Sequence, residues 1–197
     1  MALTPSPNAQ PKVGSFLLAE PFMDDPWFGR HVVFLCDYEQ QGETMGFVLN
    51  NYIQEPLSEL LPDIGAWAEG VRVSIGGPVL PSQLFFLHRF KSPVGESCMI
   101  GDQLYLGGQF EDVCAALDSG AEKIADIRFF LGYSGWSSGQ LLKEIKSKSW
   151  YLHYLPRKNR MEQLFDAQAD NLWEDMLSSK GPAFVRAAKS PRNPNHN

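Results

Sequence analysis

The chain has 197 residues, of which 44% are hydrophobic, and carries a formal net charge of −6. This length and composition predict a continuous core within one globular domain. The C-terminal segment, residues 179–197, contains four basic residues and no acidic ones. The rest of the chain, here called the body, therefore has 13 basic and 23 acidic residues. Because an acidic body repels a phosphate backbone, we expect no direct DNA binding by that part of the chain.

Several other classes are disfavoured by the pattern of residues. No apolar stretch approaches the roughly 20 residues that a membrane-spanning helix needs, and the opening "MALTPSPNAQPK" lacks the apolar centre of a secretory signal. We therefore expect a cytoplasmic protein without a membrane contact. Cys36, Cys98 and Cys114 are widely separated, and the four histidines show no ligand spacing. The sequence thus predicts no disulfide framework, no metal and no cofactor.

Predicted strands dominate the first two thirds of the chain. They are short runs rich in β-branched and aromatic residues, bounded by Asp, Gly or Asn. These runs lie at residues 16–19, 31–37, 44–50, 71–75, 84–90, 104–106 and 124–131. Residues 1–12, rich in Pro and small polar types, are expected to be disordered. Residues 13–178 are expected to form the domain, and residues 179–197 a flexible basic tail.

Helical patterns are fewer and come later. An apolar stripe from Phe110 to Leu117, with spacing i, i+3, i+4 and i+7, predicts one helix. Leu141, Leu142 and Ile145 predict a second, with Glu144 and Lys148 paired on its solvent side. A third is expected to start near Asp170. Early strands with interspersed helices predict an α+β or mixed α/β class.

The stretch "GYSGWSSGQLLKEI", residues 132–145, places small residues where a predicted strand meets a predicted helix. Three interpretations are open. Ser134 could be a nucleophile on a strained elbow, but Trp136 stands where that motif needs Gly. The helix start could bind an anion, although Ser137 and Gln140 form a capping box that satisfies the same donors. We favour the third, in which the glycines make a sharp turn and let Tyr133 and Trp136 pack closely.

Two further features are candidates for the same site. Gly76 and Gly77 could line a pocket, although a Gly-Gly-Pro break more often bends a strand. His88 lies on the same predicted strand face as apolar neighbours, which favours a hydrogen-bonded core histidine over a catalytic base. It is nevertheless the best candidate base for Ser134.

Five blocks in order along the chain resemble the YqgE/AlgH family of bacterial proteins. They are "GSFLLAEPFMDDPWF", "MGFVLN", "IGGPV", "LFFLH" and "LGYSGWSSGQLLKEI". The resemblance implies an α+β fold, with a small closed β-barrel joined to a split or bifurcated sheet and surrounded by helices. The family is labelled as regulators of transcription through a proposed link to alginate production. No helix-turn-helix pattern or basic recognition helix occurs here, so any such effect would be indirect.

The chain departs from the family pattern at three places. The family often has His in the segment matching Asp37 and Tyr38, a basic residue and Pro within the segment matching residues 50–52, and Ala in place of Ser134. Any site that used that imidazole or that basic residue is altered in this chain. The Ala further weakens the interpretation of Ser134 as a nucleophile.

We therefore expect a non-enzymatic binding or regulatory protein, with no catalytic residue. Its partner is expected to be a protein or a small anion. The expected ligand or partner groove comprises Gly76, Gly77, His88, Tyr133, Ser134, Gly135, Trp136 and Gln140. The alternative is an enzyme or small-anion binder in the same groove, hydrolase-like, with Ser134 and His88. A third hypothesis assigns polyanion binding to the basic tail.

Overall fold

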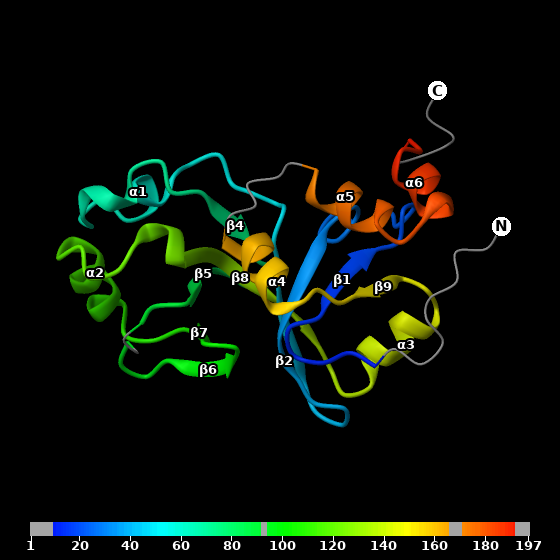
Figure 1. Cartoon of the computed structure of the whole chain (residues 1–197), viewed down its shortest axis with the longest axis horizontal. Helices are drawn as coiled ribbons and strands as arrows, with labels where there is room; N and C mark the ends of the chain where they lie inside the picture. The colour runs from blue at the N-terminus through cyan, green and yellow to red at the C-terminus, as the bar shows by residue number, and fades with distance from the viewer. Residues whose placement is uncertain (1–9, 92–93, 166–170, 192–197) are drawn as a thin grey trace.

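A long curled sheet with helices around it organises the chain (Figure 1). The computed structural model describes residues 10–91, 94–165 and 171–191. Within them, the sheet has nine strands in the order β6, β7, β5, β8, β3, β2, β1 and β9, with β4 paired to β8. The strands are β1 (Phe16–Ala19), β2 (Val32–Tyr38), β3 (Thr44–Val48), β4 (Val73–Ile75), β5 (Val79–His88), β6 (Cys98–Gly101), β7 (Leu104–Leu106), β8 (Ile127–Trp136) and β9 (Trp150–His153).

Strand β8 joins the two halves of this sheet. Its first part pairs with β4 in parallel and with β5 in the antiparallel sense, for example Leu131 with Ile75 and with Leu84. Its last part pairs with β3, where Thr44 lies opposite Trp136. The sheet therefore splits along β8, and its other half curls into an antiparallel half-barrel. The predicted α+β class with a split sheet is confirmed.

The helices lie at the two ends of the sheet and across its middle (Figure 1). They are α1 (Leu57–Leu60), α2 (Phe110–Asp118), α3 (Gln140–Lys146), α4 (Arg157–Phe165), α5 (Leu172–Ser178) and α6 (Pro182–Ala188), with short 3-10 turns at Ala66–Ala68 and Ile124–Asp126. The apolar stripe of α2 is confirmed, because Val113 and Leu117 are buried. No helix within the described ranges is both long and apolar enough to cross a bilayer.

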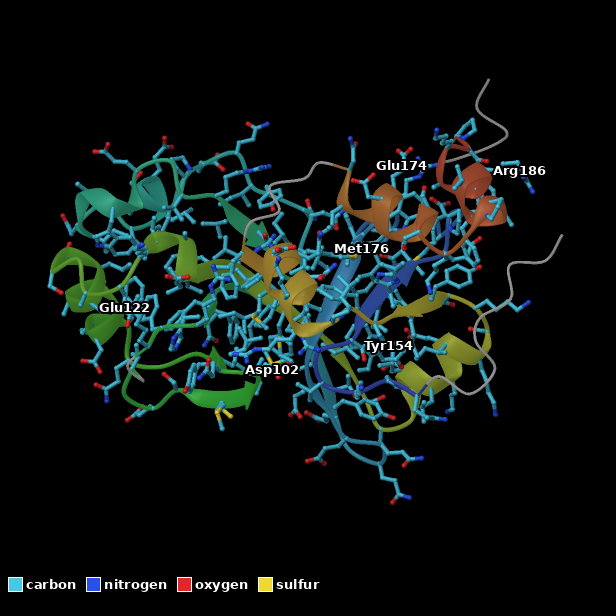
Figure 2. All side chains as sticks on the ribbon, viewed as in Figure 1. Asp102, Glu122, Tyr154, Glu174, Met176 and Arg186 are labelled. Carbon is cyan, nitrogen blue, oxygen red and sulfur yellow. The ribbon has the colours of Figure 1, made fainter. Side chains whose placement is uncertain are left out.

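Two hydrophobic clusters fill the two halves. One gathers β1, β2, β3 and β9 with α5 and α6, and the other gathers β4 and β5 with α1 and α2. Within the first, the rings of Phe47 and Phe130 stack with centroids 4.4 Å apart, which ties β3 to β8. An ion pair between Asp102, labelled in Figure 2, and Arg160 links the β6–β7 turn to α4 near the middle of the molecule. The halves are thus joined by a shared strand and by side chains.

The C-terminal helix α6 lies within residues 179–197, the segment that the sequence predicts to be a flexible tail. Its Phe184 is only 8% exposed and meets the Tyr151 ring edge to face, with centroids 5.2 Å apart. Ala188 is also buried. The packed part of the chain therefore extends ten residues past the predicted boundary at residue 178, because two apolar side chains in a basic segment suffice to anchor one short helix.

The N-terminal boundary also differs in part from the prediction. Residues 1–9 lie outside the described residues, whereas Pro11 is buried. The backbone N–H of Gly14 donates to Leu35 O at 2.9 Å, and Lys12 N donates to Ser15 Oγ at 3.1 Å. Residues 10–12, which the sequence predicts to be disordered, are therefore held beside β1 and β2.

Candidate functional site

The small-residue stretch after residue 131 continues as strand, so the predicted sharp turn at Gly132 and Gly135 is wrong. Residues 132–136 belong to β8, where Gly135 lies opposite Met45 of β3 and Tyr133 lies opposite Val79 of β5. Because main-chain partners are present on both sides, an extended chain satisfies its hydrogen bonds without turning. The turn comes at residues 137–139 and ends at Gly139, which precedes α3 with φ 71°.

The predicted close packing is nevertheless present, between main chains. A Cβ atom on Gly77 would lie 2.4 Å from the Tyr133 carbonyl oxygen, and one on Gly132 would lie 2.6 Å from Gly77 O. Both distances are far shorter than a van der Waals contact, and φ at Gly132 is 65°, a value that favours glycine. The two glycines therefore let the segment before β5 lie directly against β8.

Ser134 is a structural residue in this arrangement. Its side chain is 0% exposed, and its Oγ donates to Gly76 O at 2.9 Å. His88 lies opposite Ile127 at the start of β8, whereas Ser134 is near the end of that strand. At about 3.3 Å per residue, the two are on the order of 20 Å apart. The structure does not bring the hydroxyl and the imidazole together, so the Ser134–His88 hydrolase arrangement has no geometric basis.

His88 is a buried core histidine, which is the interpretation that the sequence favours over a catalytic base. Its Nε2 lies 3.1 Å from Ser97 Oγ, and its ring stacks on Tyr105 with centroids 5.2 Å apart. Burial lowers the pKa of His88, because a charged imidazole loses its hydration there. His88 is therefore separate from the groove to which the sequence assigns it.

A groove of about 320 Å³ opens beside the end of β8. We call it the Gly135 groove; it is lined by Asp37, Glu43, Thr44, Met45, Val79, Tyr133, Gly135, Trp136 and Ser137. Of the residues predicted from sequence, Tyr133, Gly135 and Trp136 meet here. Gly76, Gly77 and Ser134 are buried and absent from its lining, and Gln140 starts the adjacent helix. Asp37 and Glu43 were not predicted as site residues, although both flank the hairpin between β2 and β3.

One wall of the groove is fixed by Glu144, whose role the sequence does not reveal. Its Oε2 accepts hydrogen bonds from the indole N–H groups of Trp136 and Trp150, each at 2.8 Å. The two indole rings meet edge to face at 6.0 Å between centroids. The predicted Glu144–Lys148 helix pair is wrong, because α3 ends at Lys146 and Lys148 has a φ of 67°.

The helix start beside the groove offers little to an anion. Only half of the predicted capping box forms. Gln140 Oε1 accepts from Ser137 N at 3.0 Å and from Ser137 Oγ at 3.1 Å, whereas the N-cap residue is Gly139 and no side chain caps the helix. The helix that follows has only seven residues. Two carboxylates, Asp37 and Glu43, line the groove itself. The local charge therefore favours a cation over an anion.

Within the described residues, no group of three or more His, Cys, Asp or Glu side chains could hold a metal ion. The three cysteines are free, with Cys36 buried and Cys98 exposed. The groove thus offers main-chain atoms, aromatic and apolar side chains and two carboxylates. Such a surface suits non-covalent recognition.

The fold and this groove define an α+β protein in which a curled half-barrel and a split sheet share one strand. A family model described as AlgH-like matches residues 16–184. The chain belongs to that AlgH-like family. A UPF0301 protein of Parabacteroides distasonis is 34% identical over 93% of this chain and 90% of that protein. One from Bacteroides fragilis is 32% identical over 98% of this chain and 94% of that protein.

Two solved structures share the fold. The solution structure of the AlgH protein from Pseudomonas aeruginosa matches with a TM-score of 0.68 and 26% identity, over 93% of this chain and 98% of that one. A crystal structure of a protein from Corynebacterium diphtheriae matches with a TM-score of 0.71 over 92% of this chain and 94% of that one. Its 17% identity shows the fold alone.

Proposed function

We propose that this chain is a cytoplasmic, non-enzymatic binding protein that takes a basic segment of a partner protein into the Gly135 groove. Any influence on transcription would then act through that partner and not through DNA contacts of the acidic body. The observation that carries the proposal is the pairing of two exposed carboxylates, Asp37 and Glu43, with the apolar and aromatic walls of one groove. A chain carrying both cationic and apolar side chains complements such a surface.

The backbone around the groove supports a rigid recognition surface. Residues on both edges of β8 are paired, to β3 on one side and to β5 on the other. Between Val79 and Leu84 the β5 register shifts, and this bulge presents Leu80, 52% exposed and with a φ of 49°. A bulky side chain in that conformation is strained.

The buried state of Ser134 is the main argument against the enzymatic alternative. A nucleophile must reach substrate and be activated by a neighbouring base. Ser134 Oγ instead donates a hydrogen bond to Gly76 O, and the residue is buried from solvent. The hydroxyl therefore stabilises the contact between β8 and the segment before β5, which is a structural task.

The proposal is tested with two synthetic peptides of equal length, one alternating Lys with Leu and one alternating Glu with Leu. We expect the Lys peptide to perturb NMR signals of Tyr133, Trp136 and Met45, and the Glu peptide to leave them unchanged. The affinity should fall with added salt, because the carboxylates are exposed and screened. Equal binding of both peptides, or binding of neither, would contradict the proposal.

Variants then place the binding in the groove. Gly135→Arg fills the groove and adds a positive charge at an exposed position, where the nearest atom to a new Cβ, Tyr133 Cε2, lies 3.3 Å away. We expect this change and the double change Asp37→Asn with Glu43→Gln each to weaken the Lys peptide by roughly tenfold or more. Ser134→Ala is the control, since it removes a buried hydroxyl behind the groove. A Gly135→Arg protein that binds as well as wild type would exclude the groove as the site.

A further inference from the structure

Arg128 is a buried cation that has no carboxylate partner among the described residues. Its side chain lies on β8, in the half of the strand that is remote from the Gly135 groove, and the residue is 9% exposed. Among the residues that the structure describes, its guanidinium forms hydrogen bonds only with neutral oxygens. The acceptors are Leu164 O at 2.7 Å, Tyr52 Oη at 2.8 Å, Ser74 Oγ at 3.2 Å and Leu49 O.

This environment is unusual for a charged group. Burying a charge costs free energy that hydrogen bonds offset only in part, so buried arginines normally sit beside a carboxylate or a bound anion. Burial lowers the pKa of Arg128, and the nearby charge of Arg72 acts in the same direction. A guanidinium nevertheless remains protonated in proteins. Arg128 therefore carries a permanent positive charge, and no carboxylate of the described residues forms a hydrogen bond or an ion pair with it.

Arg128 lines a pocket of about 500 Å³, which we call the Arg128 pocket. Its other lining residues are Tyr52, Trp67, Glu69, Gly70, Val71, Arg72, Ile124, Ala125, Ile127, Leu164 and Phe165. None of them lines the Gly135 groove. The Arg72 guanidinium stacks over the Tyr52 ring, with Cζ 3.6 Å from the centroid, so two cations flank one phenol. Glu69, at the exposed edge, is the acidic residue of this lining.

The rest of the pocket is suited to an apolar body. Trp67 and Phe165 contribute aromatic rings, and Ile124 and Ile127 contribute aliphatic surface. Its volume lies within the usual range for small-molecule sites, of about 300 to 1,000 Å³. The lining combines these apolar side chains with the polar ones of Tyr52, Arg72 and Arg128. Arg128 supplies a polar anchor in a fixed orientation, because four acceptors hold its planar head in place.

We propose that the Arg128 pocket binds a small organic anion, with a phosphate or carboxylate group beside Arg128 and Tyr52 and an apolar body against Trp67 and Phe165. The anion supplies the negative charge that the buried guanidinium lacks. This site is independent of the partner groove proposed above. It also assigns anion binding to a location other than the Gly135 groove, where the carboxylates of Asp37 and Glu43 oppose it.

A structural role for Arg128 and a binding role are compatible, and the experiment must separate them. Arg128 links β8 to the end of α4 and to the segment after β3, so its replacement would also remove contacts that hold the fold. The decisive variants therefore leave Arg128 in place. Ala125 is exposed and lines the pocket, so Ala125→Trp fills it without touching the core. Ala121→Trp is the matched control, because Ala121 is exposed nearby but is not part of the lining.

The probes are phenyl phosphate, benzoate, inorganic phosphate and neutral benzyl alcohol, followed by NMR of the Arg128 side-chain Nε–H and the Trp67 indole N–H. We expect saturable shifts with phenyl phosphate or benzoate at millimolar concentration, corresponding to about −4 kcal/mol, and none with benzyl alcohol. The relative affinities of phenyl phosphate and benzoate identify the preferred head group. Inorganic phosphate should bind more weakly, since it lacks the apolar body.

Ala125→Trp should weaken the binding of whichever aromatic anion binds wild type more tightly by at least tenfold. Ala121→Trp should leave that affinity unchanged. Arg72→Gln should weaken binding of the same anion severalfold, because one of the two cations beside Tyr52 is lost. Absence of any shift at about 10 mM of both aromatic anions would overturn the proposal. So would equal affinity in wild type and Ala125→Trp, or an equal response to benzyl alcohol.

Discussion

Single side chains set the shape of the Gly135 groove, and Glu144 is the clearest case. One carboxylate holds two indole rings, and Gln140 Nε2 donates to its second oxygen at 2.9 Å. The charged acceptor thereby fixes Trp136, a groove wall, against Trp150 of β9. Hydrogen bonds to ionised groups are stronger than those between neutral groups. This network should therefore contribute more to the free energy of unfolding than the same number of neutral hydrogen bonds.

Glu144→Ala is expected to lower the free energy of unfolding by about 2 to 4 kcal/mol, because two largely buried indole N–H groups lose their acceptor. Glu144→Gln keeps one acceptor oxygen and should cost less. Urea unfolding followed by tryptophan fluorescence measures both. The control is Glu162→Ala, since Glu162 forms an exposed pair with Lys158 at 3.9 Å and no other side-chain hydrogen bond or ion pair among the described residues. This change should alter stability by under about 0.5 kcal/mol. Equal losses at Glu144 and Glu162 would show that the indole network contributes nothing.

At the scale of elements, β8 decides the architecture, since both halves of the sheet pair with it. Its glycines are needed where another main chain crosses, and a pair of positions tests this. Gly132 and Gly139 have nearly equal φ values, 65° and 71°, but only Gly132 is crowded by the main chain. A Cβ at Gly139 would meet nothing within 4 Å. The pair therefore separates backbone strain from steric overlap.

Gly139→Ala should cost about 1 kcal/mol, which is the strain of a left-handed alanine. Gly132→Ala should cost roughly 3 kcal/mol or more, because it adds overlap with Gly77 O and Val79 O to the same strain. Chemical denaturation of the two variants gives the difference directly. If both lose the same amount, the close approach of the two segments is not a constraint on position 132.

The sequence predicts a helix or strand correctly where the element's own pattern of apolar residues matches the surfaces that it buries. The stripe of α2 and the strand at residues 16–19 are such cases. The prediction fails where contacts with other segments of the chain decide the secondary structure. Residues 132–136 look like a turn, yet β3 and the start of β5 hold them as strand. The polar helix α4 was missed because, of its side chains, only Leu164 is buried. The acidity of the groove was missed because Asp37 and Glu43 approach Tyr133 only after the β2–β3 hairpin folds beside β8.

Across the whole molecule, the distribution of charge is more informative than its sum. An overall acidic chain, at −6, contains one groove lined by two carboxylates and, at the other end of β8, one pocket lined by two guanidinium groups. These surfaces suit opposite partners, a basic segment and an organic anion. Both sites are lined by residues of β8, so the sheet fixes their positions relative to each other. A ligand bound at one site therefore need not disturb the other.

The stability of the whole fold should depend on pH through His153 of β9. Burial, together with the charge of Lys180, lowers the pKa of His153 to about 4. In the unfolded chain an imidazole titrates near 6.5, so between these two values the unfolded state binds more protons. The free energy of unfolding therefore rises with pH across this window, and the stabilisation is lost as pH falls from about 6.5 towards 4. His88, also buried with a lowered pKa, acts in the same direction.

His153→Gln isolates this contribution from those of His88 and the carboxylates. Wild type should lose about 1 to 2 kcal/mol more than the variant between pH 7 and pH 4.5, after allowance for the partial exposure of His153. Urea denaturation at a series of pH values measures the difference. Lys180→Gln should raise the pKa of His153 and reduce the loss, because one neighbouring positive charge is removed. Parallel stability profiles for wild type and His153→Gln would show that His153 does not control the acid sensitivity of the fold.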